Sequence, residues 1–310
     1  MAQNAKVVRA AEQKNIWLLT DHLKPMLNGA ETGGLLGVAI SQQHPGEGTP
    51  PHVHRNEDEM FYVLDGEVTF LFGDKLIKAT KGDFVYAPRN IVHCFKCTSA
   101  TPSKMMLLVT PTAFMKFADS LAVPADDFAN KPAVTPELIG KLMGLAPQFG
   151  IEMLLDHPLP TTLIDAPGPI KQQWVMGERV HSFATADTTN GAFTICEIHT
   201  APAGGPPPHV HLEQDEIFFV VDGRHEFLLG DRTEIVSPGD VVVIPRGVRH
   251  RFSNLESTTG RLIDIHTPGG FERFFDECGT DATNVHTPPA FTPPPPEVIA
   301  AIFAKHGMTL

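Results

Sequence analysis

Two groups of histidine and glutamate residues in this 310-residue chain have the types and the spacing of metal ligands. Each group has a His-x-His pair, a glutamate five positions after the pair, and a third histidine 34 positions after the glutamate. The groups are His52, His54, Glu59 and His93 in the first half, and His209, His211, Glu216 and His250 in the second. Imidazole nitrogens with one carboxylate suit a borderline divalent ion, so the sequence predicts one metal site in each half.

The other histidines do not share this spacing. A single histidine is most often a structural residue, so we expect these to lie on the surface, in loops or in local hydrogen bonds. They include His44, His157, His181, His199, His225, His266, His286 and His306.

Strand geometry would bring each ligand group together. Residues i and i+2 of a strand project from the same face, so both members of a His-x-His pair point to one side. The glutamate and the last histidine lie on later strand runs, each followed by apolar residues in the same phase. These apolar residues are Phe61, Val63 and Phe95 in the first half and Phe218, Val220 and Phe252 in the second. We expect them to bind an apolar substrate beside each metal site.

The ligand set also indicates the ion. Four protein ligands leave two positions of an octahedral ion open for water, a small organic substrate or dioxygen. We expect iron(II), while manganese, nickel, cobalt and copper stay open. Zinc stays open too, because ligand type alone does not exclude a closed tetrahedral site.

The two ligand groups belong to a longer repeat with an offset of 157 residues. Its landmarks are Trp17 and Trp174, Gly66 and Gly223, Gly82 and Gly239, Pro88 and Pro245, Pro111 and Pro268, and Gly150 and Gly307. One offset held over that length predicts a tandem duplication. We expect an N-terminal domain at residues 1–157 and a C-terminal domain at 158–310.

Within each half the apolar period is two, which is typical of strands. The segments MFYVLDGEVTFLFGD and IFFVVDGRHEFLLGD each read as a hairpin joined at Asp-Gly. The segment Thr135-Pro136-Glu137 is a helix start followed by a leucine stripe. The sequence therefore predicts an all-β fold of two small barrels or jelly rolls with short flanking helices.

The chain resembles the cupin superfamily on both of that family's motifs. The first motif is complete in the first half, at Gly46, His52, His54, Glu59 and Gly66. The second motif is complete in the second half, at Gly239, Pro245, Gly247, His250 and Asn254. The resemblance implies two tandem cupin barrels, of the double-stranded β-helix or jelly-roll type, each with a metal site.

Three motif positions depart from the family pattern. In the first half Asn90 replaces the turn glycine and Cys97 replaces the final asparagine, and in the second half Ala203 replaces the leading glycine. Asparagine tolerates the left-handed backbone conformation that a turn glycine supplies. We therefore expect loop differences and intact ligands.

Among two-domain cupins, the chain is most similar to the quercetin 2,3-dioxygenase type, also in the segment TPGGFERFF at residues 267–275. In that family the metal binds a deprotonated enol or hydroxyl oxygen, and the liganding glutamate acts as the base. The resemblance implies Glu59 and Glu216 as catalytic bases of a metal-dependent dioxygenase. Its substrate would be an aromatic or enolisable apolar compound of flavonol type.

Three other functions stay open. An oxalate-decarboxylase-like enzyme would need cationic groups, yet Arg89 and Arg246 lie in predicted turns and are expected to face solvent. A cupin isomerase or cyclase would act on a polyketide-like substrate without dioxygen. A non-catalytic metal-binding or ligand-binding bicupin needs no complete ligand set, so two complete sets favour an enzyme.

Net charge and the pattern of apolar residues disfavour two classes of partner, nucleic acids and membranes. With 24 Lys and Arg against 36 Asp and Glu, the net charge of −12 disfavours nucleic acid. The sequence has neither a secretory apolar segment at its start nor an apolar run of about 20 residues. We expect a cytoplasmic protein without a membrane partner, and a homodimer as the assembly to consider.

Overall fold

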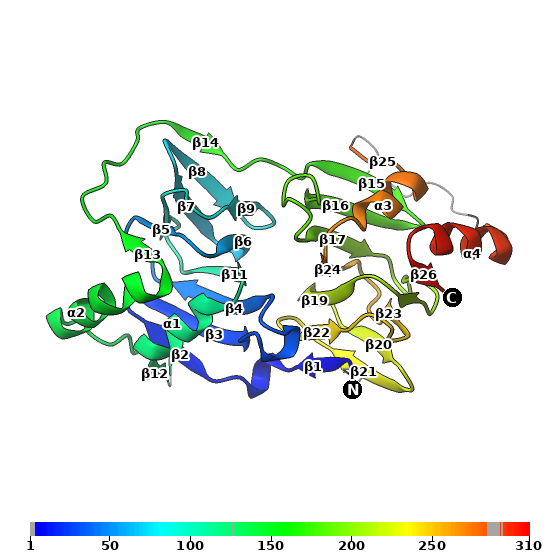
Figure 1. Ribbon diagram of the computed structural model, residues 1–310, viewed down its shortest axis with the longest axis horizontal. Helices are drawn as coiled ribbons and strands as arrows, with labels where there is room; N and C mark the ends of the chain where they lie inside the picture. The colour runs from blue at the N-terminus through cyan, green and yellow to red at the C-terminus, as the bar shows by residue number, and fades with distance from the viewer. Residues whose placement is uncertain (1–3, 126, 284–291, 293) are drawn as a thin grey trace. The chain divides into compact units, whose positions relative to one another are not determined.

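The computed structural model describes residues 4–125, 127–283, 292 and 294–310. The chain divides into two compact units (Figure 1). The N-terminal unit is Ala11–Gly168, and the C-terminal unit combines Met1–Ala10 with Pro169–Leu310. Residues 1–157 and 158–310 remain our proposed limits for the duplicated sequence, and the compact units differ from those limits at both ends of the first repeat.

The N-terminal unit contains two facing sheets. One has the strand order β12-β2-β3-β4-β11-β6-β9 and the other β13-β5-β10-β7-β8-β14. The strands of the first sheet are β2 (Asn15–Leu18), β3 (Asp21–Leu27), β4 (Gly37–Gln43), β6 (Asp58–Asp65), β9 (Phe84–Ala87), β11 (Ser103–Thr110) and β12 (Val123–Ala125). Those of the second are β5 (His52–His54), β7 (Glu67–Phe72), β8 (Lys75–Thr80), β10 (His93–Cys97), β13 (Ile151–Met153) and β14 (Leu163–Asp165).

The C-terminal unit repeats this arrangement. Its main sheet has the order β1-β22-β19-β24-β17-β16-β15-β25, and smaller sheets pair β21-β20-β23 and β18-β26. The main-sheet strands are β1 (Lys6–Val8), β15 (Lys171–Val175), β16 (Glu178–Ala184), β17 (Thr194–Thr200), β19 (Asp215–Asp222), β22 (Val241–Ile244), β24 (Gly260–Thr267) and β25 (Gly279–Asp281). The others are β18 (Val210–His211), β20 (His225–Leu229), β21 (Arg232–Val236), β23 (His250–Asn254) and β26 (Met308–Thr309).

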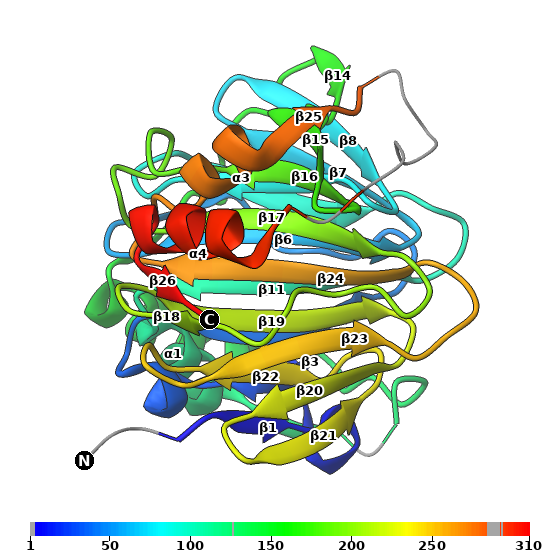
Figure 2. The same ribbon diagram turned by 90° about the vertical axis from the view of Figure 1, so that its right-hand side faces the viewer.

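Among the described residues, four short α-helices flank these sheets, so the predicted all-β class with short helices is confirmed. They are α1 (Ala113–Leu121), α2 (Pro136–Leu145), α3 (Glu272–Cys278) and α4 (Pro296–Lys305). Thr135 caps α2 as predicted, since its side chain accepts a 3.2 Å hydrogen bond from Leu138 N. Figure 2 shows α4 leading into β26, which pairs with β18. None of the helices described is long and apolar enough to cross a membrane.

The motif departures are accommodated by the backbone. Asn90 has φ 69°, close to the 83° of its counterpart Gly247, so the asparagine supplies the left-handed turn as expected. Ala203, which replaces a glycine, also has a positive φ of 57°. Both ligand groups therefore keep the loops that lead into them.

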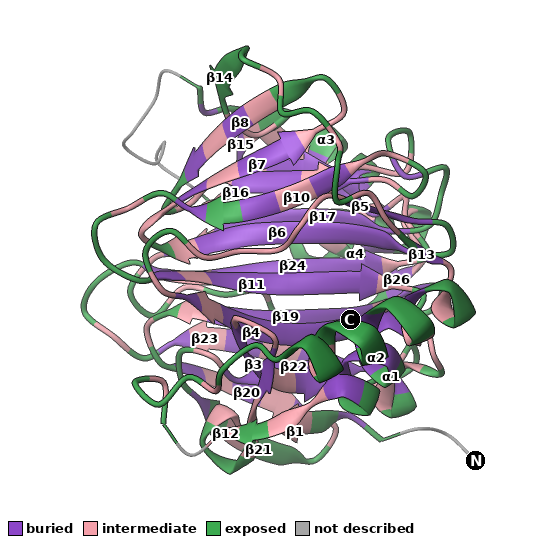
Figure 3. Ribbon diagram, turned by 90° about the vertical axis from the view of Figure 1, so that its left-hand side faces the viewer, coloured by how far each residue is buried: buried purple, intermediate pink, exposed green. Residues whose placement is uncertain are grey.

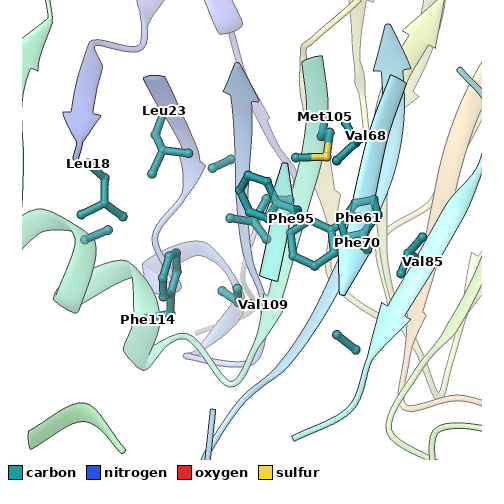
Figure 4. Close-up of a cluster of buried hydrophobic side chains, with 14 of the residues drawn as sticks. Leu18, Leu23, Phe61, Val68, Phe70, Val85, Phe95, Met105, Val109 and Phe114 are labelled. Carbon is teal, nitrogen blue, oxygen red and sulfur yellow. The ribbon is translucent and has the colours of Figure 1, made fainter. Parts of the chain in front are cut away.

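An aromatic triad lies at the centre of each barrel. In the N-terminal unit, Phe61, Phe70 and Phe95 have ring centroids 5.0 to 6.1 Å apart, and Figure 4 shows them facing one another. Their counterparts Phe218, Phe227 and Phe252 are 5.2 to 5.8 Å apart. Figure 3 shows the central strands β6 and β11 buried along most of their length, whereas α2 is largely exposed. The triads pack at the base of the two metal-ligand groups.

The first strand of the chain belongs to the C-terminal unit. Strand β1 pairs antiparallel with β22, with Val7 opposite Val242. Asp240 fixes the end of β1, because its carboxylate accepts hydrogen bonds from Ala10 N at 2.9 Å and from Arg9 Nη1 at 3.2 Å. The same carboxylate accepts from Ser237 N at 3.0 Å and so also fixes the turn before β22.

We expect Asp240→Ala to speed amide hydrogen exchange in Lys6–Val8 by about tenfold, because charged hydrogen bonds that hold β1 are lost. The matched control is Asp83→Ala. Asp83 is the repeat counterpart and accepts only from Thr80 N and Thr80 Oγ1 among the bonds observed. Equal exchange in the two variants would contradict the role given to Asp240.

Candidate metal centres

The N-terminal site is assembled from three strands. His52 and His54 are the two ends of β5, Glu59 lies on β6, and His93 begins β10, directly opposite His52 in the register. All four side chains are buried, and one ligand atom of each lies within 4.8 Å of the others. The structure therefore brings the predicted group together.

Backbone carbonyls fix two of the imidazole rings. His52 Nδ1 lies 2.8 Å from the carbonyl oxygen of Pro50, and His93 Nδ1 lies 2.9 Å from that of Ile91. Because a carbonyl oxygen only accepts, each Nδ1 carries the hydrogen and donates it. In the neutral ring the lone pair is then on Nε2, which faces the other ligands.

The resulting arrangement requires a cation. His93 Nε2 lies 2.9 Å from Glu59 Oε2, and His54 Nε2 lies 3.5 Å from Glu59 Oε1. Neutral imidazole nitrogens and carboxylate oxygens are all acceptors, so they repel at this distance unless a proton or a metal ion lies between them. His54 Nε2 has no hydrogen-bond partner among the described residues. The donor set therefore fits a divalent ion.

The C-terminal site has the same construction. His209 and His250 pair across a β-bridge, and their Nδ1 atoms lie 3.0 and 2.9 Å from the carbonyl oxygens of Pro207 and Val248. His250 Nε2 is 2.6 Å from Glu216 Oε2. His211 belongs to the same group, whose ligand atoms again lie within 4.8 Å of one another. The same cation requirement applies here.

Burial and neighbouring charges set the protonation of the ligands. Burial lowers the pKa of His52 to about 3 and that of His209 to about 4, with the adjacent histidines acting in the same direction. Burial opposes ionisation of Glu59, but the neighbouring imidazoles of His54 and His93 outweigh it and hold the pKa of Glu59 at about 2. Neutral His52 and His209 and an ionised Glu59 are the forms that bind a metal ion.

The C-terminal site has an additional histidine that sequence analysis missed. His266, expected in a surface, loop or local role, is fully buried, and its Nε2 lies 3.2 Å from Glu216 Oε1. Asp264 Oδ1 lies 3.5 Å from the other ring nitrogen of His266, and the ring stacks on Phe271 at 4.0 Å. That expectation was wrong for His266, because β24 pairs with β19 and places it directly opposite Glu216.

Comparison of the two halves of the sequence does not reveal His266. Its counterpart in the first half is Val109, so a comparison of the halves gives no sign of a polar residue there. The available signal was the spacing of Asp264 and His266, two residues apart in an apolar run, which places both on one face of a strand. His286, also assigned an outer role, lies outside the described residues.

The two sites open into cavities of very different size. The N-terminal cavity, whose walls include His52, His54, Glu59, Phe61, Phe95 and Phe114, has a volume of about 60 Å³. The C-terminal cavity, whose walls include His209, His211, Glu216, Phe252, Phe271 and Phe303, has about 340 Å³. Small-molecule sites usually measure about 300–1,000 Å³, and a water molecule takes about 30 Å³. Of the two cavities, the C-terminal one has a volume within the range of small-molecule sites.

The six residues expected to bind substrate divide into two groups. Phe61 and Phe95 line the N-terminal cavity, and Phe252 lines the C-terminal one. All six belong to the hydrophobic cores, and the other three, Val63, Phe218 and Val220, are not among the described residues that line either cavity. Phe218 is the repeat counterpart of Phe61, so a shared phase with the ligands does not ensure that a side chain reaches the cavity.

The C-terminal cavity instead receives its aromatic wall from the segment after β24. Phe271, Phe274 and Phe275, at the start of α3, line it together with Phe303 of α4. These four residues were not among the expected substrate contacts. The motif TPGGFERFF was the available signal, since it contains three of them.

A third cluster has ligand-type residues but a different environment. His181, Glu197 and His199 lie on β16 and β17, with His199 Nε2 3.1 Å from Glu197 Oε2. Arg261 Nη1 lies 3.3 Å from the other carboxylate oxygen of Glu197. The guanidinium already supplies positive charge to this carboxylate, so the cluster is an ion-pair network.

Comparison with known proteins identifies the family. The family model described as cupin domain matches the chain twice, at residues 39–110 and 196–266, and each match contains one complete ligand group. The chain is a bicupin. The bicupin is 23% identical over 273 residues to quercetin 2,3-dioxygenase of Bacillus subtilis (strain 168), which is 82% of the chain and 80% of that protein.

Two further relatives share parts or all of the fold. The bicupin is 31% identical over 114 residues to quercetin 2,3-dioxygenase of Aspergillus japonicus, which is 34% of the chain and 32% of that protein. The structure of Lactobacillus farciminis oxalate decarboxylase with formate covers 87% of both chains with a TM-score of 0.61 and 15% identity. The likeness to the oxalate decarboxylase structure, at 15% identity, concerns the two-barrel fold.

We expect the purified bicupin to bind two transition-metal ions per chain, because each unit has its own buried donor set. The double variant His52→Ala with His54→Ala should lose only the N-terminal ion, and His209→Ala with His211→Ala only the C-terminal ion. Elemental analysis of the reconstituted protein measures this. A wild-type chain that saturates with one ion, or binds none, would contradict the prediction.

Proposed function

We propose that the C-terminal site is the active site of a metal-dependent dioxygenase that acts on an aromatic or enolisable apolar substrate of flavonol type. The observation that carries the proposal is the 340 Å³ cavity, which joins a metal-ligand group to an aromatic wall. The likeness to two quercetin 2,3-dioxygenases supports it. The N-terminal site, with about 60 Å³, would bind an ion but not this substrate.

The residues of the cavity have distinct tasks in this proposal. A divalent ion held by His209, His211, Glu216 and His250 would supply Lewis-acid chemistry toward a substrate oxygen; we propose iron(II), with manganese, nickel, cobalt, copper and zinc as alternatives. The phenylalanine wall binds the substrate rings and excludes water. Glu216, whose pKa His250 and His211 keep low despite burial, is ionised and accepts the proton of the substrate hydroxyl.

The overall reaction needs no further reagent. Loss of the proton leaves an electron-rich enolate, and one of its carbon atoms forms a bond to dioxygen. Cleavage of the ring then leaves both oxygen atoms in the products. The electrons that reduce dioxygen come from the substrate carbon atoms, so the balance requires no external reductant.

The cavities do not favour oxalate. No lysine or arginine is among the described residues that line either cavity. Arg89 forms a bidentate pair with Asp58, and Arg246 forms one with Asp215, and both arginine side chains are more than two-fifths exposed. A small dicarboxylate would therefore meet no cationic partner next to the metal ligands.

We expect Glu216→Gln to lower turnover of a flavonol by about 10²–10⁴, the range for a lost general base, while Glu59→Gln stays near the wild-type rate. Metal content is measured in both variants, so that loss of the ion is not mistaken for loss of the base. Equal rates in both variants would show that the glutamate is only a ligand. A loss confined to Glu59→Gln would assign the reaction to the N-terminal site.

We also expect strict anaerobiosis to stop product formation from a flavonol, and readmission of air to restore it with stoichiometric oxygen uptake. An isomerase, a cyclase or a binding protein has no such requirement. Product formation that continues without oxygen would replace the dioxygenase by a cyclase or isomerase. Carbon dioxide release from oxalate would instead support the decarboxylase alternative.

A further inference from the structure

Glu178 lines the C-terminal cavity with a carboxyl group that is not part of the metal-ligand group. Its Oε2 accepts a 3.2 Å hydrogen bond from Ala201 N, and the backbone N–H of Gly205 also donates to this carboxyl group. A side chain at Gly204 would overlap Glu178 Oε1. The loop before the His-x-His pair is thus shaped around the carboxyl group.

The repeat counterpart of Glu178 is Asp21, and its environment is different. Ser41 Oγ donates to Asp21 Oδ1 at 3.0 Å, and Gln43 Nε2 donates to the same oxygen. In the C-terminal unit an isoleucine that lines the cavity replaces Ser41, and Thr200 replaces Gln43. The hydroxyl of Thr200 makes no hydrogen bond among the described residues. Side-chain donors therefore engage Asp21, whereas backbone donors hold Glu178.

The carboxylate of Glu178 can accept further hydrogen bonds. A carboxylate has about four lone-pair sites, and the two backbone N–H groups use two of them. Asp264, the other acid of the cavity wall outside the ligand group, belongs to the cluster of Glu216 and His266, with its Oδ1 3.5 Å from His266 Nδ1. Glu178 is therefore the carboxyl group of this wall that lies apart from the metal-ligand residues and their direct neighbours.

The position of Glu178 is separate from that of the metal ligands. His209 pairs with His250 on β23, whereas Gly205 packs against the carbonyl of Phe252, two residues further along the same strand. Two residues of a strand span about 7 Å. A ligand that contacts both places would therefore reach along the cavity and carry a polar group at each of them.

The electrostatics of Glu178 agree with such a contact. Burial raises the pKa of Glu178 to about 7, against the opposing effect of the Ala201 and Gly205 N–H groups. Near neutral pH the group therefore exists both as a carboxylate and as a carboxylic acid. It can accept a hydrogen bond from a phenolic hydroxyl or donate one to it.

We propose that Glu178 binds a second hydroxyl group of the substrate, at the end of the cavity away from the metal ligands. This inference rests on the proposed function and specifies its substrate class. The substrate is a flat polyphenol with an enolic oxygen for the metal site and a hydroxyl on a distant ring for Glu178. Glu178 is thus a specificity-determining residue.

The test compares two probes on zinc-loaded protein under anaerobic conditions, where binding is measured without turnover. Kaempferol carries hydroxyl groups on its distant rings, and 3-hydroxyflavone lacks them. We expect the wild-type protein to bind kaempferol about tenfold more tightly than 3-hydroxyflavone, as titrated by absorbance. Glu178→Gln should reduce this preference and leave the affinity for 3-hydroxyflavone unchanged, because the amide has a single acceptor oxygen and the backbone N–H groups of the loop already require it.

Asp21→Asn is the matched control, because Asp21 lies on the wall of the 60 Å³ cavity, and it should keep the wild-type preference. Zinc content and 3-hydroxyflavone affinity report whether Glu178→Gln is correctly folded. Glu178→Ala, which leaves space and no acceptor, should lose the preference too. Three results would overturn the proposal. They are an equal loss of affinity for both probes in the Glu178 variants, an unchanged preference for kaempferol in those variants, and no binding of either probe to the wild-type protein.

The result of this test can be told apart from the result of the test of the proposed function. If the probes bind with the Glu178-dependent preference but the enzyme consumes no oxygen, the dioxygenase proposal fails and the role of Glu178 stands. If oxygen is consumed while the preference does not depend on Glu178, only this inference fails.

Discussion

The constraint on which the structure depends is the burial of four opposed acceptor groups in each barrel. Imidazole lone pairs and a carboxylate face one another at 2.6 to 3.6 Å in a space from which water is largely excluded. Such a cluster is stable only around a positive charge. The backbone carbonyls that accept hydrogen bonds from the opposite ring nitrogens fix this orientation. The backbone therefore holds the ligands in an arrangement that needs a cation.

That constraint explains why the ligands are alike in the two units while their surroundings differ. Seven of the eight ligands project from strands and His209 from a β-bridge, so backbone pairing fixes their positions and neighbouring side chains can change without moving them. In the C-terminal unit Asp264 and His266 stand where the N-terminal unit has Leu107 and Val109. The arrangement of the metal ligands is the same in the two halves. The polarity of the residues next to the ligand glutamate and the volume of the adjoining cavity differ between them.

The sequence was sufficient for the features that local patterns determine. The eight ligands, the Asp-Gly hairpins, the left-handed turn at Asn90 and the Thr135 cap all follow from residue type and short-range spacing. The role of His266 depends on which strand lies opposite Glu216, and the cavity volumes depend on packing among distant segments. Neither is contained in the alternation of a single strand, which is why Val63, Phe218 and Val220 were expected at a wall that they do not reach.

Strand β1 ties the beginning of the chain to residues that are synthesised much later. Arg9 and Asp240 are 231 positions apart, and at about 5–20 residues per second the partner of β1 emerges at least ten seconds after β1 itself. Strand β1 therefore has no partner strand during that time, and an unpaired strand is a template for pairing with another chain. A nascent chain with a free β1 and a neighbouring chain with a free β22 could exchange these strands. The order of synthesis thus gives this fold a route to domain swapping.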